Sequence, residues 1–352
     1  APPPLSPPPP PRVPLWAPPP PWPGAPPRRF SDPRLRQLSG RSATYVGGNP
    51  RLSPALLNLV SHAEARGVWR VRGGMHRLAE ALAALFTARG GTLRLSTHAR
   101  RIERQSGRVR AVVTADGTRL PCRAALFAGD PRALSQGLLG QGLALPDAAT
   151  EPRSLSALVW AFAATPQGPG LAHHNVFFGA DPATEFKPLA QGHLPGDPTV
   201  YLCAQDRGTH LAPPALERFE TIVNAPPLRG PGPEPDTCRQ LTFQSLARHG
   251  LTFSPAPPDS ALTTPQHFDA LFPASLGSLY GRSPHGLTAA LKRPQARTAV
   301  PGLYLAGGGA HPGAGVPMAT LSGAHAAAAM RKDLASTSTS PRTATRGGMS
   351  TA

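Results

Sequence analysis

The segment that most constrains the fold is residues 302–330, GLYLAGGGAHPGAGVPMATLSGAHAAAAM. A short apolar run leads into three consecutive glycines, a second glycine-rich turn and an alanine-rich stretch. That stretch begins near Val316-Pro317, where proline suits the first turn of a helix. Glycine costs about 0.5–1 kcal/mol in a regular element, so this density predicts a backbone that another group approaches closely. Exposed loop N–H groups and the positive end of a helix dipole suit a phosphate or the electron-rich edge of a ring.

The residues alone leave two interpretations of this loop open, a cofactor site and a tight structural turn between a strand and a helix. Its spacing is not G-x-G-x-x-G, and no acidic residue follows a second strand about 20 positions later, so it lacks the standard dinucleotide-binding fingerprint. A single loop histidine, here His311, is more typical of a structural hydrogen-bonding residue than of a catalytic base.

Both ends of the chain have compositions that disfavour packing. Residues 1–28 are mostly proline, which lacks a backbone N–H, so we expect an extended, disordered segment. A ligand for a proline-binding groove is the alternative interpretation. Residues 335–352 are small and polar, and we expect a disordered tail there.

The sequence between these ends has the periodicity of an α/β protein. Residues 67–91 predict a short strand, a turn at Gly73-Gly74 and a helix that ends at Gly90-Gly91. Four residues of that helix recur at the spacing of one buried stripe: Leu78, Leu82, Leu85 and Phe86.

Further along, the pattern changes to that of a second domain and then returns. A strand at 92–97, a hairpin around Asp116-Gly117 and a buried strand within 124–131 are typical of a nucleotide-binding domain with an inserted meander. From about 150 to 285, alternating strand candidates predict a mixed domain whose large sheet covers a ligand. The apolar run Leu303–Ala306 then returns to the first domain.

Charge and cysteine content narrow the classes of partner. The formal net charge is +17, yet the arginines are scattered and no nucleic-acid-binding motif is present, so we expect no nucleic-acid partner. No apolar run approaches the roughly 18 residues of a membrane span, and no signal-peptide pattern is found. Cys122, Cys203 and Cys238 are far apart and lack metal-ligand spacing, so we expect a reducing compartment, no disulfide framework and no metal.

Several longer stretches, together with the glycine loop, resemble the carotenoid desaturases related to bacterial phytoene desaturase. The likeness is strongest to the 1-hydroxycarotenoid 3,4-desaturase branch, the hydroxyneurosporene or methoxyneurosporene dehydrogenases. It runs through residues 30–334 and is carried by FSDPRLRQL–SATYVGGNP (30–50), GVWRVRGGMHRLAEALA (67–83), LVWAFAA with HHNVFFG (158–179), VYLCAQDRG (200–208), FPASLGSLYGRSPHGL (272–287) and LYLAGGGAHPGAGVPMATLSG (303–323).

This resemblance implies an α/β fold in which an incomplete FAD-binding domain, of the glutathione-reductase-like Rossmann type, carries an inserted mixed α+β substrate domain. The implied division is 1–28, a Pro-rich disordered segment; 29–66, a remnant of the substrate domain; 67–150, part of the FAD-binding domain; 151–290, the substrate-binding domain; 291–334, the C-terminal part of the FAD-binding domain; and 335–352, a disordered tail.

The resemblance also implies where FAD would bind. The glycine loop would lie along the flavin, and the helix beginning near Pro317 would point its N-terminus at the pyrimidine side of the ring. Ala99 would lie in the strand that contacts the adenine, and Asp130 in a turn that matches the family's Ala-Asp-Pro, although Ala128 replaces the expected Asn. The implied residues are Ala99, Asp130, Gly307, Gly308, Gly309, His311, Gly313, Gly315, Val316, Pro317 and Met318.

The implied reaction is dehydrogenation of an acyclic carotenoid that carries a hydroxyl or methoxyl group, with a hydride passing to FAD. No catalytic residue is assigned, and His311, His285 and Arg282 are candidate neighbours of the site. The expected partners are the carotenoid, a membrane surface touched peripherally and an electron acceptor, oxygen or a quinone. The expected location is the cytoplasmic side of a bacterial inner membrane.

The chain departs from this family where the ADP half of FAD is held. The family opens with a strand, a G-x-G-x-x-G and an acidic residue, and this sequence contains none of these. We therefore expect this polypeptide alone to bind FAD weakly or not at all. Two alternatives stay open: an oxidoreductase similar to flavin amine oxidases or protoporphyrinogen oxidases, and a non-catalytic remnant or interaction protein that uses its proline-rich arm.

Overall fold

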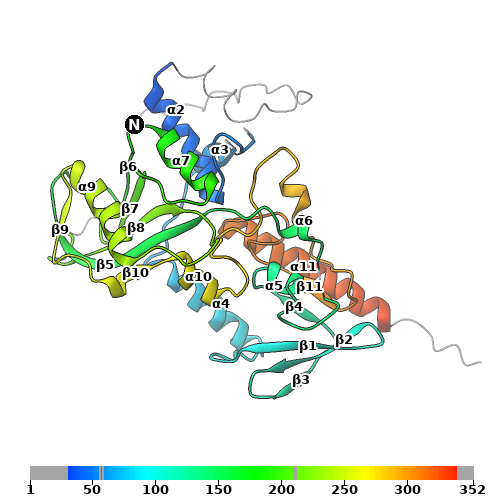
Figure 1. Ribbon diagram of the computed structural model, residues 1–352. Coiled ribbons are helices and arrows are strands. Elements are labelled where there is room, and N and C mark those ends of the chain that lie inside the picture. Colours follow the sequence, from blue (N-terminus) through cyan, green and yellow to red (C-terminus); the bar gives the residue numbers. More distant parts are fainter. Residues whose placement is uncertain (1–30, 55–56, 58, 144, 209–211, 339–352) are drawn as a thin grey trace, which may run out of the picture.

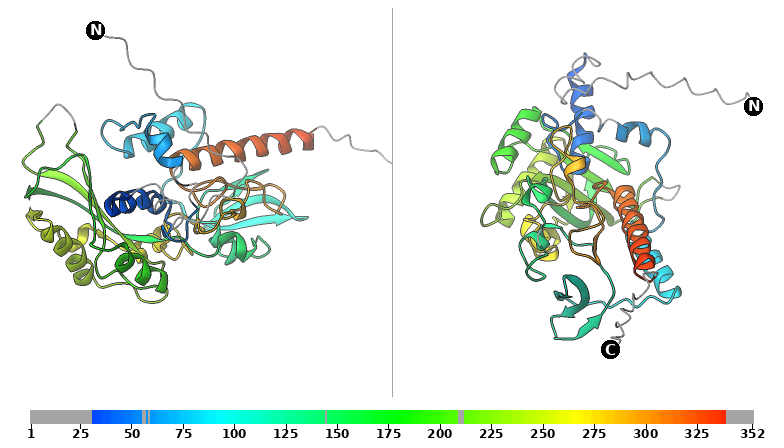
Figure 2. Two further views of the ribbon diagram at one scale, coloured as in Figure 1. Left: turned by 90° about the horizontal axis from the view of Figure 1, so that it is seen from above. Right: turned by 90° about the vertical axis from the view of Figure 1, so that its right-hand side faces the viewer.

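The computed structural model describes residues 31–54, 57, 59–143, 145–208 and 212–338 (Figure 1). The proline-rich segment 1–28 lies outside the described residues. The described strands form three sheets, and Figure 2 shows the largest sheet at the opposite end of the molecule from the three-stranded sheet. The result is a mixed α/β fold, as the sequence predicts.

The largest sheet has six antiparallel strands built around the long strand β5. β5 pairs with β8, β9 and β10, and β7 joins β8 to the edge strand β6. The strands are β5 Ser156–Gln167, β6 His174–Phe177, β7 Val200–Ala204, β8 Glu217–Ala225, β9 Thr252–Ser254 and β10 Leu262–Thr263. The alternating strand candidates between 150 and 285 are confirmed.

A helical layer covers one face of this sheet. Successive side chains along a strand point to opposite faces of the sheet. The strand register therefore puts Leu158 and Trp160 of β5 and Leu202 of β7 on the same, covered face, where they are fully buried. They pack with Leu246 of the helical layer, and Trp160 meets Phe243 edge-on, with ring centroids 5.1 Å apart. The layer is α8 Pro235–Arg239, the π-helical η4 Gln240–Gln244 and α9 Ser245–Arg248.

Short helices complete this half of the molecule. Asp181 caps the N-terminus of α7, where its side chain accepts a hydrogen bond of 2.8 Å from the N–H of Ala183. Thr264 and His267 form a reciprocal capping box at the start of α10. The helices are α2 Pro33–Gly40, η2 Arg41–Val46, α3 Leu59–Glu64, α7 Pro182–Gln191, η5 Asp259–Ala261 and α10 Pro265–Leu271.

The other half is built on two parallel strands that lie far apart in the sequence. β4 (Ala125–Phe127) and β11 (Leu303–Leu305) pair in register, so the chain returns to β4 after completing the large sheet. The antiparallel meander β1–β2–β3 contributes Ile102 and Val109 to the same core. The remaining elements are β1 Ala99–Gln105, β2 Arg108–Thr114, β3 Arg119–Pro121, α4 His76–Ala88, α5 Arg132–Ser135, α6 Asp147–Thr150, η6 Ala290–Lys292 and α11 Val316–Ser338.

The C-terminal helix extends into the segment where we expected a disordered tail, residues 335–352. α11 runs on to Ser338, so the first residues of the 335–352 segment are helical, while 339–352 lie outside the described residues. Figure 2 shows α11 as one continuous rod along the outside of the molecule. Within the described part of the chain, no helix combines the length and apolar character needed to cross a bilayer.

Three predictions around α4 are wrong. Residues 67–72 and 92–97 are irregular rather than strands, and none of the residues of α4 is buried. Leu82, Leu85 and Phe86 are half exposed or more. The physical reason is that a strand needs a hydrogen-bonding neighbour and an apolar stripe needs a sheet to cover. Among the described residues, the parallel sheet consists only of β4 and β11.

We predict that the exposed stripe of α4 contributes little to the stability of this polypeptide. Leu82, with 58% of its surface exposed, should tolerate Leu82→Ser with a loss of less than about 0.5 kcal/mol in the free energy of unfolding. By contrast, Leu158→Ala, at a fully buried position, should lower the free energy of unfolding by about 2–5 kcal/mol. Urea unfolding of the two variants checks the contrast, and comparable losses would mean that α4 packs against the rest of the chain.

Candidate functional site

The glycine loop leaves the parallel sheet at the end of β11. Leu303, Tyr304 and Leu305 are buried, and the N–H of Ala306 donates to the carbonyl of Phe127, at 3.1 Å. Gly307 follows with φ of +100°, a conformation that favours glycine. Its N–H donates to Ser322 Oγ of α11, at 2.7 Å, so the loop is tied to the helix that follows it.

The N-terminus of α11 faces outward from this loop, and the helix begins at Val316 as the sequence predicts. Within the described residues, nothing accepts a hydrogen bond from the backbone N–H groups of Gly315, Val316 or Met318. Gly315 has φ of +97°, and a Cβ added there would meet no atom within 4 Å. Free N–H groups, open space and the helix dipole together suit an electron-rich group.

The turn after β4 is held against the glycine loop. A Cβ on Gly309 would lie 2.5 Å from Pro131 Cδ, so only glycine allows the two loops to approach this closely. Asp130 accepts a hydrogen bond from the N–H of Arg132, at 2.9 Å, and pairs with the buried Arg153. The structure therefore brings Asp130 next to the loop, but its carboxylate binds an arginine of the chain itself.

Three buried arginines lie in this region and are here called the arginine cluster: Arg153, Arg282 and Arg293. Asp130 pairs with Arg153, and the charge of Glu151 acts on Arg282. Arg293 donates to the carbonyl of Gly308 and to that of Arg282, each at 2.7 Å. Burial, together with the charges of Arg282 and Arg153, lowers the pKa of Arg293 to about 10. Positive charge therefore exceeds negative charge beneath the glycine loop.

Sequence reasoning missed two members of this cluster. Arg153 and Arg293 lie in loops with no recognisable motif, and only the fold places them under residues 307–309. A formal charge of +17 is also a poor signal for a local cluster, because most of the arginines that the structure describes are exposed.

His311, one of the candidate neighbours of the site, lies within the loop. The backbone N–H of His311 donates to Pro294 O at 2.8 Å, and its ring stacks on His325 with centroids 6.5 Å apart. These contacts fit the structural role that is usual for a loop histidine. Gly313, with φ of +143°, follows directly and packs beside the guanidinium of Arg293.

Ala99 starts β1, which belongs to a different sheet from β4 and β11. A hollow of about 490 Å³ beside it is lined by Arg100, Arg101 and Thr114, among other residues. A second hollow of about 590 Å³ lies between α2 and α7. No residue of the glycine loop lines either hollow.

His285 has an unusual environment and gives a testable pH dependence. Its Nε2 accepts a hydrogen bond of 2.8 Å from the N–H of Asn49, and burial with the charge of Arg282 lowers its pKa to about 4. Protonation is thus harder in the folded state than in the unfolded state, where the pKa is about 6.5. Stability linked to His285 is fully present above pH 6.5 and is lost as the pH falls toward 4.

We expect His285→Gln to remove this dependence, since a glutamine oxygen can accept the same hydrogen bond. The unfolding free energy of the native protein should fall more than that of the variant between pH 7 and 4, by up to about 3 kcal/mol. Urea unfolding across this range measures the difference. Parallel curves for the two proteins would contradict the assignment.

The comparisons with known proteins agree with this arrangement. Residues 23–331 match the family model described as flavin containing amine oxidoreductase. The chain belongs to this family. A flavin is therefore the cofactor class of its family, in agreement with the expected FAD.

Relatives support the resemblance to carotenoid desaturases. The chain is 57% identical over 312 residues to hydroxyneurosporene desaturase of Cereibacter sphaeroides, covering 88% of this chain and 63% of the relative. It is 54% identical over 308 residues to hydroxyneurosporene desaturase of Rhodobacter capsulatus, covering 86% of this chain and 62% of the relative. The chain thus spans somewhat less than two thirds of the length of these relatives.

A solved structure supports the fold. An oxidoreductase from Methanosarcina mazei superposes with a TM-score of 0.51 at 16% identity, covering 86% of this chain and 66% of that one. At this identity the likeness concerns the mixed α/β fold only.

The described residues fit one end of a flavin. The positive-φ glycines, the space at Gly315 and the free N–H groups at the start of α11 leave room for a flat ring with an anionic edge. The G-x-G-x-x-G turn that would hold the ADP end is not in the sequence. Gly307, Gly308, Gly315 and Val316 are the residues that would hold the ring.

Proposed function

We propose that this chain is the larger part of an FAD-dependent desaturase of a hydroxylated or methoxylated acyclic carotenoid such as hydroxyneurosporene. The observation that carries the proposal is the open N-terminus of α11 beside the glycine loop, above the arginine cluster. The substrate class comes from the names of the relatives that are 57% and 54% identical.

In this proposal the chain positions the ring and stabilises its charge. When bound, FAD supplies the redox chemistry and accepts a hydride. The free N–H groups of Val316 and Met318 and the helix dipole would face the ring edge that becomes negative on reduction. The excess positive charge of the arginine cluster would act in the same direction from below the loop.

The partners follow from the chemistry of the substrate. A carotenoid is confined to membranes, so we propose peripheral contact with the cytoplasmic face of a bacterial inner membrane. Oxygen or a quinone would take the electrons from the reduced flavin. We propose that Ala99 and Asp130 are the residues of this chain nearest the adenosine half of the cofactor, and we assign no catalytic acid or base.

Absorption spectroscopy after incubation with excess FAD and gel filtration tests the proposal first. Liposomes that contain a hydroxylated acyclic carotenoid then test the reaction, which should extend the chromophore and shift its absorption to longer wavelength. A primary amine assayed in parallel for hydrogen peroxide tests the amine oxidase alternative. Desaturation would support the proposal, whereas peroxide formation with no change in the carotenoid would replace it.

A further inference from the structure

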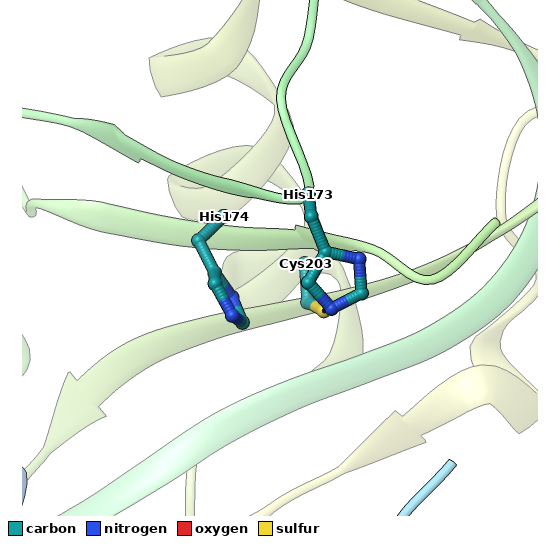
Figure 3. Close-up of side chains that lie close together, drawn as sticks. All are labelled: His173, His174 and Cys203. Atoms are coloured by element: carbon teal, nitrogen blue, oxygen red, sulfur yellow. Dashed lines mark hydrogen bonds between the residues drawn. The ribbon is translucent and has the colours of Figure 1, made fainter. Parts of the chain in front are cut away.

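Three side chains with metal-binding atoms converge on the edge of the large sheet. His173, His174 and Cys203 come from the start of β6 and from β7, and their ligand atoms all lie within 4.8 Å of one another (Figure 3). The sequence predicted no such site, because 28 residues separate the histidine pair from the cysteine and no short motif links them. The pairing of β6 with β7 brings them together.

The strand register explains why these side chains meet. His174 lies directly opposite Cys203 in the antiparallel β6–β7 pair, so their side chains share one face of the sheet. His173 precedes the strand, and its carbonyl accepts a hydrogen bond of 2.8 Å from the N–H of Ala204. The ring of His173 turns back toward the same face, and its centroid lies 4.4 Å from that of the His174 ring.

Hydrogen bonds leave a free nitrogen on each imidazole. His173 Nδ1 lies 2.9 Å from the carbonyl of Ala204 and 3.1 Å from that of Arg207, and these two acceptors outnumber the one donor beside it, Arg70 at 3.0 Å, so they favour a proton on Nδ1. Nε2 of His173 then carries a lone pair, and it faces Cys203 Sγ at 3.7 Å. His174 Nδ1 bonds the hydroxyl of Tyr201 at 2.7 Å, which leaves its Nε2 free. Backbone and hydroxyl contacts of this kind orient metal-binding histidines.

The spacing suits a tetrahedral ion. With Zn–S of about 2.3 Å and Zn–N of about 2.0–2.1 Å, a sulfur and a nitrogen on the same zinc are about 3.6 Å apart. Cys203 Sγ and His173 Nε2 are already at 3.7 Å. The His174 side chain is exposed, so it can rotate to close the remaining gap.

The charges around the cluster are mixed. Arg70 lies 3.0 Å from His173 Nδ1 and opposes a cation, although its guanidinium donates to the carbonyls of Arg207 and Gly208. The side chain of Arg207 is paired with Glu217 through two hydrogen bonds of 2.6 and 2.7 Å. Glu220 lies opposite Cys203 on β8 and adds negative charge to the face that carries the cluster.

We propose that His173, His174 and Cys203 form a binding site for a divalent cation with affinity for sulfur and nitrogen, of which Zn²⁺ is the representative. Binding joins Nε2 of both histidines and Sγ of the cysteine to the metal, and the thiol proton passes to solvent. The ion would fasten the segment before β6 to β7, at the edge of the sheet. Nothing in the comparisons assigns a metal to this position.

Co²⁺, used as a spectroscopic substitute for zinc, tests the site in the 352-residue chain. We expect one equivalent to give a thiolate-to-cobalt charge-transfer band and the intense visible bands of tetrahedral cobalt, both removed by added Zn²⁺. Cys203→Ser should abolish the charge-transfer band. His174→Ala should weaken binding more than 100-fold, because loss of a mere supporting contact already costs about 10–100-fold.

Two matched variants control for other cysteines and histidines. Cys122→Ser removes a free thiol outside the cluster, and His62→Ala removes an exposed histidine on α3, so both should bind cobalt as the native chain does. Because Cys203 is buried, far-UV circular dichroism checks that Cys203→Ser is folded; if it is not, His174→Ala decides. A native chain without the bands, or undiminished binding by His174→Ala, would overturn the proposal.

Discussion

Asp130→Ala is expected to lower the free energy of unfolding by about 3–5 kcal/mol, the cost of leaving a buried charge unpaired. The side chains of Asp130 and Arg153 are 7% and 3% exposed, so water cannot replace the lost partner. The substitution also leaves the N–H of Arg132 without its acceptor. Urea unfolding of the native chain and the variant measures the loss.

Two further variants distinguish the effect of losing this ion pair from the general effect of removing a carboxylate. Glu80→Gln breaks an exposed pair with Arg77 on α4 and should cost less than about 1 kcal/mol. The double variant Asp130→Ala/Arg153→Met removes both buried charges, and its loss should be smaller than the sum of the two single losses. A loss for Asp130→Ala no larger than that for Glu80→Gln would show that the pair is solvated in solution.

The local patterns of the sequence predicted the elements whose partners lie within the described residues. The apolar or alternating stretches LSALVWAFAA (155–164) and TVYLCAQ (199–205) predicted β5 and β7, and Asp116-Gly117 predicted the hairpin between β2 and β3, because each pattern reflects contacts made nearby. Pro317 and the glycines before it predicted a helix that begins near Val316-Pro317, and α11 begins at Val316.

The failures of prediction concern contacts that a local pattern cannot contain. The stripe at Leu82 and Leu85 has the period of a buried helix, but burial needs a sheet that the described residues do not supply. Arg293 and Cys203 carry no motif, since their neighbours come from distant segments through the β4–β11 and β6–β7 pairings. The domain boundaries and the FAD-binding residues named from the resemblance stay predictions.

Gly315→Leu is expected to raise the Kd for FAD at least tenfold in the 352-residue chain, equivalent to about 1.4 kcal/mol. In the proposed site, the described residues form a cradle only for the ring end of the cofactor, so we expect weak binding by the native chain, measured by titration of flavin fluorescence. A side chain at Gly315 would occupy the open space beside the free N–H groups of Val316 and Met318.

Gly250→Leu is the matched control for this effect. Gly250 has φ of +79°, and a Cβ added there would also meet no atom within 4 Å, but it lies at the end of α9, in the large-sheet half. Both substitutions force a side chain into left-handed backbone and should cost about 1–2 kcal/mol of stability. Only Gly315→Leu should weaken flavin binding, because only that side chain projects into the ring cradle. Equal losses of affinity would trace the effect to stability, and an unchanged Kd in Gly315→Leu would place the flavin elsewhere.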